Sequence, residues 1–353
     1  MAEKPFASHL VAWQKCHGRN DLPWQVSDPY RVWLSEIMLQ QTQVATVLDY
    51  YRRFLESFPT LADLAAAPQS AVLACWSGLG YYSRARNLHK AAQWVMEECG
   101  GAFPDQRQDI EALPGVGRST AAAIAAFAFG RREAILDGNV KRVLTRCFGI
   151  EGFPGEKKVE QRLWLLAESL LPDEGIVAYT QGLMDLGATI CTRGRPTCEH
   201  CPLQADCVAS REGRVGELPT PRPRKSIPTR HTVMLLAQSG RSVWLERRPP
   251  SGIWGGLLSL PEFADSFAVG DWLARQGKGD VLPAWAEFEH VFSHYRLIIT
   301  PLPVRLDSLF ADAVREETGE WVALDVAPDA GVPAPVRKLL LKLARSAGAG
   351  PEN

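Results

Sequence analysis

Helical periodicity dominates the chain up to about residue 210. Apolar residues recur there at the three- and four-residue spacing of amphipathic helices, and prolines and short polar stretches separate the segments. This pattern predicts an all-α region with helices at residues 6–17, 29–41, 43–57, 60–66, 69–75, 83–98, 107–112, 118–129, 137–147, 156–170, 175–187 and 204–210.

The pattern changes after residue 211. Residues 212–230 mix prolines with cations, which predicts a semi-rigid linker rather than a packed element. Beyond the linker, alternating apolar positions predict strands at 231–237, 242–247, 285–292 and 295–304, with helices at 267–276 and 336–347. We therefore predict a multidomain protein, with an all-α domain at 1–211 followed by an α+β domain at 231–347.

Composition and charge exclude some classes of protein but do not identify a function. The 353 residues are 46% hydrophobic and 22% charged, as in an ordinary globular protein, and no apolar run approaches the ~18 residues of a membrane span. The N-terminus lacks the apolar core of a signal peptide, so we expect a cytoplasmic protein. Because the net charge is −1, any affinity for nucleic acid must come from local cations: Arg84, Arg86 and Lys90, Arg118, or Lys141, Arg142 and Arg146.

Residues 110–120 form the clearest local motif. Leu113 and Val116 are apolar anchors, Pro114 ends one helix, and Gly115 and Gly117 allow a tight turn before the next helix. Amide N–H groups at the start of a helix favour an anion such as phosphate. The motif therefore predicts a helix-hairpin-helix that binds a phosphate backbone.

Two carboxylates are candidates for catalysis. An alanine-rich helix leads from the hairpin to Asp137, which stands beside Asn139. Glu36 lies among Trp33 and Ile37, where apolar surroundings would keep a carboxyl protonated and suit it to donate a proton. On pattern alone, the polar stripe that contains Glu36 equally fits a solvated helix face.

Two aromatic stretches are compatible with base recognition. Residues 78–86 place paired tyrosines after two glycines, with Arg84 and Arg86 nearby for phosphates, although a packed loop has the same pattern. Residues 289–295 hold two histidines and a serine, a pattern more typical of a structural hairpin.

The cysteines fall into two groups. We interpret the scattered ones as thiols without a special role: Cys16, Cys75, Cys99 and Cys147. The others lie close together with C-x6-C-x2-C-x5-C spacing: Cys191, Cys198, Cys201 and Cys207. This crowding favours a [4Fe–4S] cluster held by four thiolates, with zinc as the alternative, because structural zinc sites usually use two well-separated short pairs. Arg193 and Arg195 in the same loop could meet phosphate or simply be surface charge.

In this order, the motifs resemble those of adenine DNA glycosylases of the MutY type, in the helix-hairpin-helix superfamily that includes endonuclease III. The resemblance spans nearly the whole chain. It rests on the cysteine loop and on LPWQ (22–25), SEIMLQQTQV (35–44), GLGYYSRARNLHKAA (78–92), LPGVGRSTA (113–121), ILDGNVKRV (135–143), RPPSGIWGGL (248–257) and FSH (292–294). It implies an all-α glycosylase domain with a helix-hairpin-helix (110–120) and a [4Fe–4S] loop (191–207), followed by an α+β Nudix-like lesion-recognition domain.

The resemblance also implies roles for individual residues. Glu36 corresponds to the proton donor and Asp137 to the carboxylate that stabilises the sugar cation, supported by Asn139, Ser119 and Trp24. The four clustered cysteines correspond to iron ligands. The DNA contacts correspond to Gln41, Tyr81, Leu113, Gly115, Val116, Gly117 and Lys141, and recognition of 8-oxoguanine to Phe292, Ser293 and His294.

The implied activity is removal of adenine mispaired with 8-oxoguanine or guanine in double-stranded DNA, by a monomer associated with the nucleoid. Bifunctional relatives place a lysine nucleophile directly after the hairpin Gly-Arg, where this chain has Ser119, so we predict a monofunctional glycosylase. The alternatives are a pyrimidine glycosylase with lyase activity and a non-catalytic iron–sulfur DNA-binding protein. Residues 315–319 (REETG) resemble a fragment of the Nudix metal-binding box but lie too late in the domain, so we interpret them as surface charge.

Overall fold

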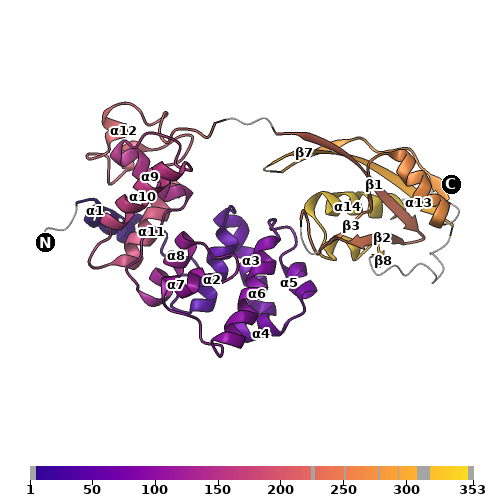
Figure 1. Ribbon diagram of the computed structural model, residues 1–353, viewed down its shortest axis with the longest axis horizontal. Coiled ribbons are helices and arrows are strands. Elements are labelled where there is room, and N and C mark those ends of the chain that lie inside the picture. Colours follow the sequence, from indigo (N-terminus) through magenta and orange to yellow (C-terminus); the bar gives the residue numbers. More distant parts are fainter. Residues whose placement is uncertain are drawn as a thin grey trace. The chain divides into compact units, whose positions relative to one another are not determined.

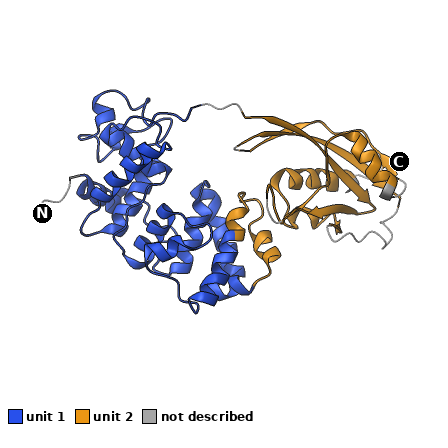
Figure 2. Cartoon of the chain, viewed as in Figure 1, with its two compact units in different colours: residues 1–66, 87–224 blue, residues 67–86, 225–353 orange. Residues whose placement is uncertain are grey.

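The computed structural model describes residues 5–223, 227–249, 252–276, 279–292, 294–307 and 319–348. By its contacts the chain divides into two compact units, shown in blue and orange in Figure 2. Unit 1 comprises Met1–Ala66 with Asn87–Arg224, and unit 2 comprises Ala67–Arg86 with Lys225–Asn353. The domain limits expected at residues 211, 230 and 347 stay a prediction.

Helices build unit 1, which confirms the expected all-α region (Figure 1). Most predicted helices end within one or two residues of the observed ones. The observed helices up to residue 211 are α1 (Pro5–His17), α2 (Pro29–Leu39), α3 (Val44–Ser57), α4 (Leu61–Ala66), α5 (Gln69–Cys75), α6 (Ser83–Glu98), α7 (Arg107–Glu111), α8 (Arg118–Phe129), α9 (Gly138–Phe148), α10 (Lys157–Ser169), α11 (Ile176–Asp185) and α12 (Val208–Arg211).

Two departures from the expected helices lie near the cysteines. Helix α11 continues as a π-helix, η1 (Leu186–Ile190), which leads directly to Cys191, and a 3₁₀ turn, η2 (Cys198–His200), follows. The helix expected at 204–210 is wrong in its first half, because α12 begins only after Cys207. π-helical turns are rare and occur frequently at functional sites.

Helix α8 is the centre of unit 1. Its residues Ala121–Ala126 are buried, and the helix contacts α2, α7 and α11. Short alanine side chains allow these helices to approach closely, and Gly130 ends α8 in the left-handed conformation. The packing fixes α2 on one side and the segment that leads to α9 on the other.

Unit 2 is an α+β unit built on one sheet, as expected. The strands β1 (Thr229–Ser239) and β7 (Arg296–Leu306) pair in parallel at its centre, with Thr229 opposite Arg296. The other strands are β2 (Ser242–Arg247), β3 (Leu258–Ser259), β4 (Glu262–Phe263), β5 (Gly279–Val281), β6 (Phe288–Val291) and β8 (Gly319–Ala323).

The sheet order is β3-β2-β1-β7-β5, with β4 paired to β1, β6 to β7 and β8 to β2. One apolar core includes Val336 and Leu340 of helix α14 (Ala334–Gly348), and another includes Val269 and Trp272 of helix α13 (Ser266–Gln276). Residues 315–318 of the Nudix-like fragment lie outside the described residues.

The segment Ala67–Arg86 is part of unit 2. The Tyr82 hydroxyl donates to the carbonyl oxygen of Val332 at 3.2 Å, and the Arg86 guanidinium donates to that of Gly255 at 2.5 Å. These contacts tie the tyrosine loop at 78–82 to the sheet unit rather than to unit 1.

Candidate active site

A pocket of about 380 Å³ lies in unit 1 beside helix α2. Trp24 is 6% exposed and packs edge-on against Tyr51, with ring centroids 5.4 Å apart. Apolar, amide and hydroxyl side chains line the pocket together with one guanidinium, that of Arg19, and one carboxylate; the lining includes Leu22, Trp24, Val32, Glu36, Phe127 and Gln181. The structure therefore brings two of the predicted site residues, Trp24 and Glu36, to the same cavity.

Glu36 is positioned by a well-defined helix start. The Asp28 side chain accepts a hydrogen bond from the backbone N–H of Arg31 at 3.0 Å, and Pro29 occupies the first helical position. Burial, together with the negative charge of Asp137, raises the pKa of Glu36 to about 8. Within the described part of the chain, no hydrogen bond to the Glu36 carboxyl opposes this shift. Glu36 is therefore largely protonated at pH 7.

Unlike Glu36, Asp137 is surrounded by hydrogen-bond donors. It caps helix α9, and its carboxylate accepts a hydrogen bond from the backbone N–H of Val140 at 2.8 Å. Burial raises the pKa of Asp137, but the N–H groups of Val140 and Asn139 and the charge of Arg142 act against that shift. The donors around Asp137 therefore favour its ionised form, whereas within the described part of the chain no such donor is recorded at the Glu36 carboxyl.

Asn139 connects the start of α9 to the cysteine loop. Its side-chain oxygen accepts from Arg142 at 2.8 Å, and the same guanidinium donates to the carbonyl oxygens of Gly187 and Cys191 at 2.6 and 2.7 Å. A Cβ atom on Gly187 would lie 2.5 Å from that of Asn139, so the π-helix approaches Asn139 as closely as glycine allows. Arg142 therefore joins the helix that carries Asp137 to the first clustered cysteine.

Ser119 holds the segment before Asp137. Its hydroxyl oxygen accepts from the backbone N–H of Leu136 at 2.9 Å, and Leu136 is buried. The position where bifunctional relatives carry an amine is thus occupied by a hydrogen-bond acceptor that orders the backbone.

The hairpin divides into buried and exposed residues. Leu113 and Val116 are 2% and 7% exposed and anchor the turn, whereas Gly115 and Gly117 face solvent. Gly115 has a φ of +80°, and a Cβ there would lie 2.7 Å from that of Asn87. Leu113 and Val116 are therefore buried anchors of the turn, and the exposed part of the hairpin is the backbone at Gly115 and Gly117.

Gln41 and Tyr81 both have left-handed backbones, with φ of 57° and 49°. Residues other than glycine rarely adopt this backbone conformation without a local constraint, and such strain often marks functional sites. Gln41 is exposed, and Tyr81 is 55% exposed despite its aromatic ring. Each side chain is thus presented to solvent by its own unit.

Several predicted phosphate-binding cations have protein partners instead. The prediction for Arg84 is wrong, because its guanidinium is buried and donates to the carbonyl oxygens of Leu79 and Gly80. Arg118 lies over the Trp164 ring and pairs with Glu168. Lys141 Nζ lies 2.5 Å from Glu160 Oε1. Both acidic partners belong to helix α10.

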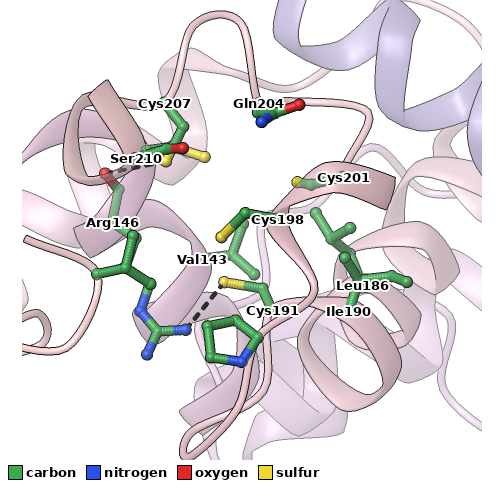
Figure 3. Close-up of a pocket in the computed structure, with 13 residues that line it drawn as sticks. Val143, Arg146, Leu186, Ile190, Cys191, Cys198, Cys201, Gln204, Cys207 and Ser210 are labelled. Carbon is green, nitrogen blue, oxygen red and sulfur yellow. Dashed lines mark hydrogen bonds between the residues drawn. The ribbon is translucent and has the colours of Figure 1, made fainter. Parts of the chain in front are cut away.

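The four clustered cysteines line one pocket, shown in Figure 3. The pocket is much smaller than the one beside Glu36, with a volume of about 20 Å³ against about 380 Å³. The Arg146 guanidinium donates to Cys191 Sγ at 3.4 Å and to the carbonyl oxygen of Thr192 at 2.8 Å. Arg193 and Arg195 are exposed in the same loop. In the residues that the structure describes, no three His, Cys, Asp or Glu side chains converge closely enough to hold a single ion.

The predicted lesion-reading residues lie after strand β6 in unit 2. The Phe292 ring packs against Trp254, His290 and Tyr295, with centroids 5.5, 4.6 and 4.7 Å away. His294 is exposed and lies edge-on to Tyr295 at 4.9 Å. Ser293 lies outside the described residues.

Comparison with known proteins follows the same division of the chain. The family described as HhH-GPD superfamily base excision DNA repair protein matches residues 34–169, and the NUDIX domain family matches residues 232–342. Adenine DNA glycosylase of Buchnera aphidicola subsp. Acyrthosiphon pisum is 36% identical over 342 residues, which cover 96% of this chain and 98% of that protein. The chain belongs to the adenine DNA glycosylase family. It is thus an enzyme of the class that hydrolyses N-glycosyl bonds.

More distant comparisons agree with this family. Human adenine DNA glycosylase is 34% identical over 359 residues, covering 83% of this chain and 65% of that protein. A thermostable thymine-DNA glycosylase structure aligns with a TM-score of 0.54 and 33% identity over 59% of this chain and 95% of its own. Endonuclease III in a non-covalent DNA complex aligns with a TM-score of 0.50 and 23% identity over 59% and 94%, which shows the shared fold.

These comparisons confirm the predicted family and fold class. Within the described residues, no helix has the length and apolarity to cross a membrane. Sequence reasoning missed the role of Arg142 as a connector and the buried Asp185, which pairs with Arg19 at 2.7 Å and accepts from Gln181 at 2.9 Å. For Asp185 the available signal was a single charged residue at the end of a largely apolar helical segment, 176–185.

Proposed function

We propose that this member of the adenine DNA glycosylase family is a monofunctional enzyme that removes adenine paired with 8-oxoguanine or guanine in duplex DNA. The observation that carries the proposal is a pair of buried carboxylates with different surroundings: burial raises the pKa of Glu36 to about 8 with help from the charge of Asp137, whereas hydrogen-bond donors and the charge of Arg142 favour the ionised form of Asp137. Such a pair supplies an acid for the leaving base and a negative charge beside the sugar.

The proposed reaction follows from this pair. An N-glycosidic bond within a duplex is accessible only after the nucleotide leaves the base stack, and the pocket beside Trp24 would receive the flipped adenine. Glu36 donates a proton to a ring nitrogen, so that adenine leaves as a neutral base. Asp137 stabilises the positive charge that develops on the sugar, and water completes the hydrolysis.

DNA binding is assigned to features on each unit. The exposed backbone at Gly115 and Gly117 would hold a phosphate, with Lys141 contributing charge, and Gln41 and Tyr81 would enter the base stack. Phe292, Ser293 and His294 would read 8-oxoguanine opposite the adenine. The strained backbones of Gln41 and Tyr81 and the exposure of His294 support these roles. This substrate would place the enzyme with the genome in the cytoplasm.

We further propose that Cys191, Cys198, Cys201 and Cys207 hold one [4Fe–4S] cluster. These four thiols line one pocket and lie within a short stretch of the chain, and this crowding favours a multi-atom group over zinc. The Arg146 N–H at Cys191 Sγ would stabilise a thiolate ligand. A bound cluster would hold the four thiolates together and would thereby order the loop that carries Arg193 and Arg195.

The test is product analysis on a duplex with one A:8-oxoguanine pair. The proposal predicts free adenine and an intact strand that breaks only after treatment with base or heat. Because Ser119 provides no amine, appreciable strand cleavage without that treatment would contradict the monofunctional assignment. Release of a pyrimidine instead would favour the endonuclease III-like alternative, and no release at all would favour a non-catalytic DNA-binding protein.

A further inference from the structure

Helix α14 in unit 2 carries basic residues and no acidic one. The basic residues are Arg337, Lys338, Lys342 and Arg345. Arg337 pairs with Asp329 at 3.0 Å. The other three, termed the α14 cations below, are exposed, and within the described part of the chain none of them forms an ion pair. Their spacing of four and then three residues places them along one stripe of the helix.

Two of the α14 cations lie over aromatic rings. Lys338 Nζ is 5.4 Å from the centroid of the Phe288 ring, and Lys342 Nζ is 4.1 Å from that of Trp285. Both rings pack against the apolar core on which α14 lies. Because a ring is neutral, it attracts and restrains an ammonium group without cancelling its charge. The two lysines are therefore positioned and remain positively charged.

The α14 cations lie beside the strand that leads to the predicted lesion-reading residues. Phe288 begins β6, which pairs antiparallel with β7 and ends at Val291, directly before Phe292. Phe292 packs against the same apolar core as Phe288 and Trp285. At ~3.3 Å per residue, the distance along the chain from Phe288 to Phe292 is about 13 Å. This is about four steps along one DNA strand, at ~3.4 Å per step.

The acidic residues near this stripe have partners of their own. Glu289 of β6 pairs with Arg296 at 3.5 Å, and Glu287 accepts a hydrogen bond from the Thr300 hydroxyl at 2.6 Å. In unit 1, by contrast, the ammonium of Lys141 is paired with a carboxylate of α10. An anionic partner can therefore approach the α14 cations without first displacing a carboxylate.

We propose that the α14 cations bind the phosphate backbone of the duplex whose lesion is read at residues 292–294. The stripe from Lys338 to Arg345 is ~10 Å long at ~1.5 Å per residue, which matches about three phosphates of one strand. Since the whole chain has a net charge of −1, local cations such as these are needed to attract a polyanion. The inference rests on the proposed substrate and gives these residues no part in the chemical step.

The test compares the full-length wild type with Lys338→Met/Lys342→Met, which removes two charges but keeps long side chains over the rings. Arg345→Met is a second variant, because Arg345 lies over no ring among the described residues and its loss leaves that packing intact. The control is Arg241→Met/Arg305→Met. It removes two exposed cations at the end of the sheet away from the lesion-reading residues. Fluorescence anisotropy measures the affinity for an A:8-oxoguanine duplex at several salt concentrations.

For Lys338→Met/Lys342→Met, we expect a loss of affinity of roughly 5- to 50-fold in ~0.1 M salt. The slope of log affinity against log salt concentration should become smaller by about 2, one for each lost phosphate contact. Arg345→Met should lower this slope by about 1. The excision rate at saturating protein should stay within a few-fold of wild type. The control should keep wild-type affinity and slope.

Wild-type affinity and slope in Lys338→Met/Lys342→Met would overturn the proposal, as would an equal loss in the control, which would show a general effect of charge. Binding to vesicles of phosphatidylserine and phosphatidylcholine that the same substitutions abolish, with DNA affinity unchanged, would assign the stripe to a membrane surface and also overturn it. If the duplex binds with the predicted dependence on these residues but no adenine is released, the proposed activity is wrong and this inference stands.

Discussion

The protonation of Glu36 makes the chemistry of the proposed site dependent on pH. With a pKa of about 8, raised by burial, Glu36 carries its proton at neutral pH and loses it as the pH rises. We predict that the single-turnover rate of adenine excision is nearly constant between pH 6.5 and 7.5 and falls about tenfold per unit well above pH 8. Glu36→Gln should show a low residual rate without this decline. An unchanged wild-type rate up to pH 9.5 would remove Glu36 as the acid.

Ser119 allows a second test at the scale of one residue. Ser119→Ala removes the acceptor for the buried Leu136 N–H, and an unpaired buried donor costs about 1–3 kcal/mol. We expect the free energy of unfolding, from urea titration, to fall by that amount. The excision rate should fall as well, because Leu136 adjoins Asp137. Ser119→Thr keeps the hydroxyl and serves as the control; equal stability of Ala and wild type would contradict a positional role.

Sequence reasoning identified Glu36 and Asp137 but not what connects them. Apolar neighbours of Glu36 suggested a raised pKa, and the structure bears out the direction. The contribution of Asp137 to that shift depends on how α2 and the start of α9 pack around α8, which no local pattern records. The donors around Asp137 likewise follow from its position as a helix cap and from the later Arg142.

At the scale of elements, we expect helix α10 to compete with DNA for two cations. Glu160 pairs with Lys141, and Glu168 pairs with Arg118. A phosphate must displace these carboxylates to use either cation. We predict that Glu160→Gln binds nonspecific duplex more tightly, by roughly 2- to 5-fold in ~0.1 M salt, with a steeper dependence of affinity on salt.

The matched control is Glu156→Gln. It makes the same charge change at the cap of α10, where the side chain forms no ion pair within the described part of the chain. Fluorescence anisotropy with an undamaged duplex measures both variants. Equal gains for the two would show a general charge effect, and the competition at Lys141 would then be wrong.

The helices were predictable because long amphipathic segments carry a clear period and prolines separate them. Four strands were missed: β3, β4, β5 and β8. The first three have only two or three residues, too few to show alternation. The π-helix η1 was also missed, because its geometry depends on the close approach of Gly187 to Asn139. These elements are set by tertiary contacts rather than by local pattern.

At the scale of the whole molecule, the cluster loop is expected to serve DNA binding more than chemistry. Cys198→Ser removes one proposed ligand and should disorder the loop that presents Arg193 and Arg195. We predict a loss of duplex affinity of roughly tenfold, with a single-turnover rate at saturating protein within a few-fold of wild type. Cys99→Ala is the control. If the Cys198→Ser protein lacked iron and still bound duplex DNA as tightly as the wild type, the cluster loop would have no role in DNA binding.

The order of the two folds along the chain was evident from the change of period near residue 211. The grouping of Ala67–Arg86 with the sheet was not. It rests on contacts such as that of Tyr82 with Val332, between residues far apart in the sequence. The helical pattern of the segment gave no indication of which unit it joins.

The most direct test of the account is single-turnover excision on an A:8-oxoguanine duplex by wild type, Glu36→Gln and Asp137→Asn. Both substitutions keep the side-chain shape and remove one function each, proton donation or negative charge. If Glu36 donates the proton and Asp137 carries the negative charge, the wild type releases adenine. The single-turnover rate of each variant then falls on the order of 10²–10⁴-fold, with duplex binding retained. Excision by both variants within a few-fold of wild type would contradict this assignment of roles.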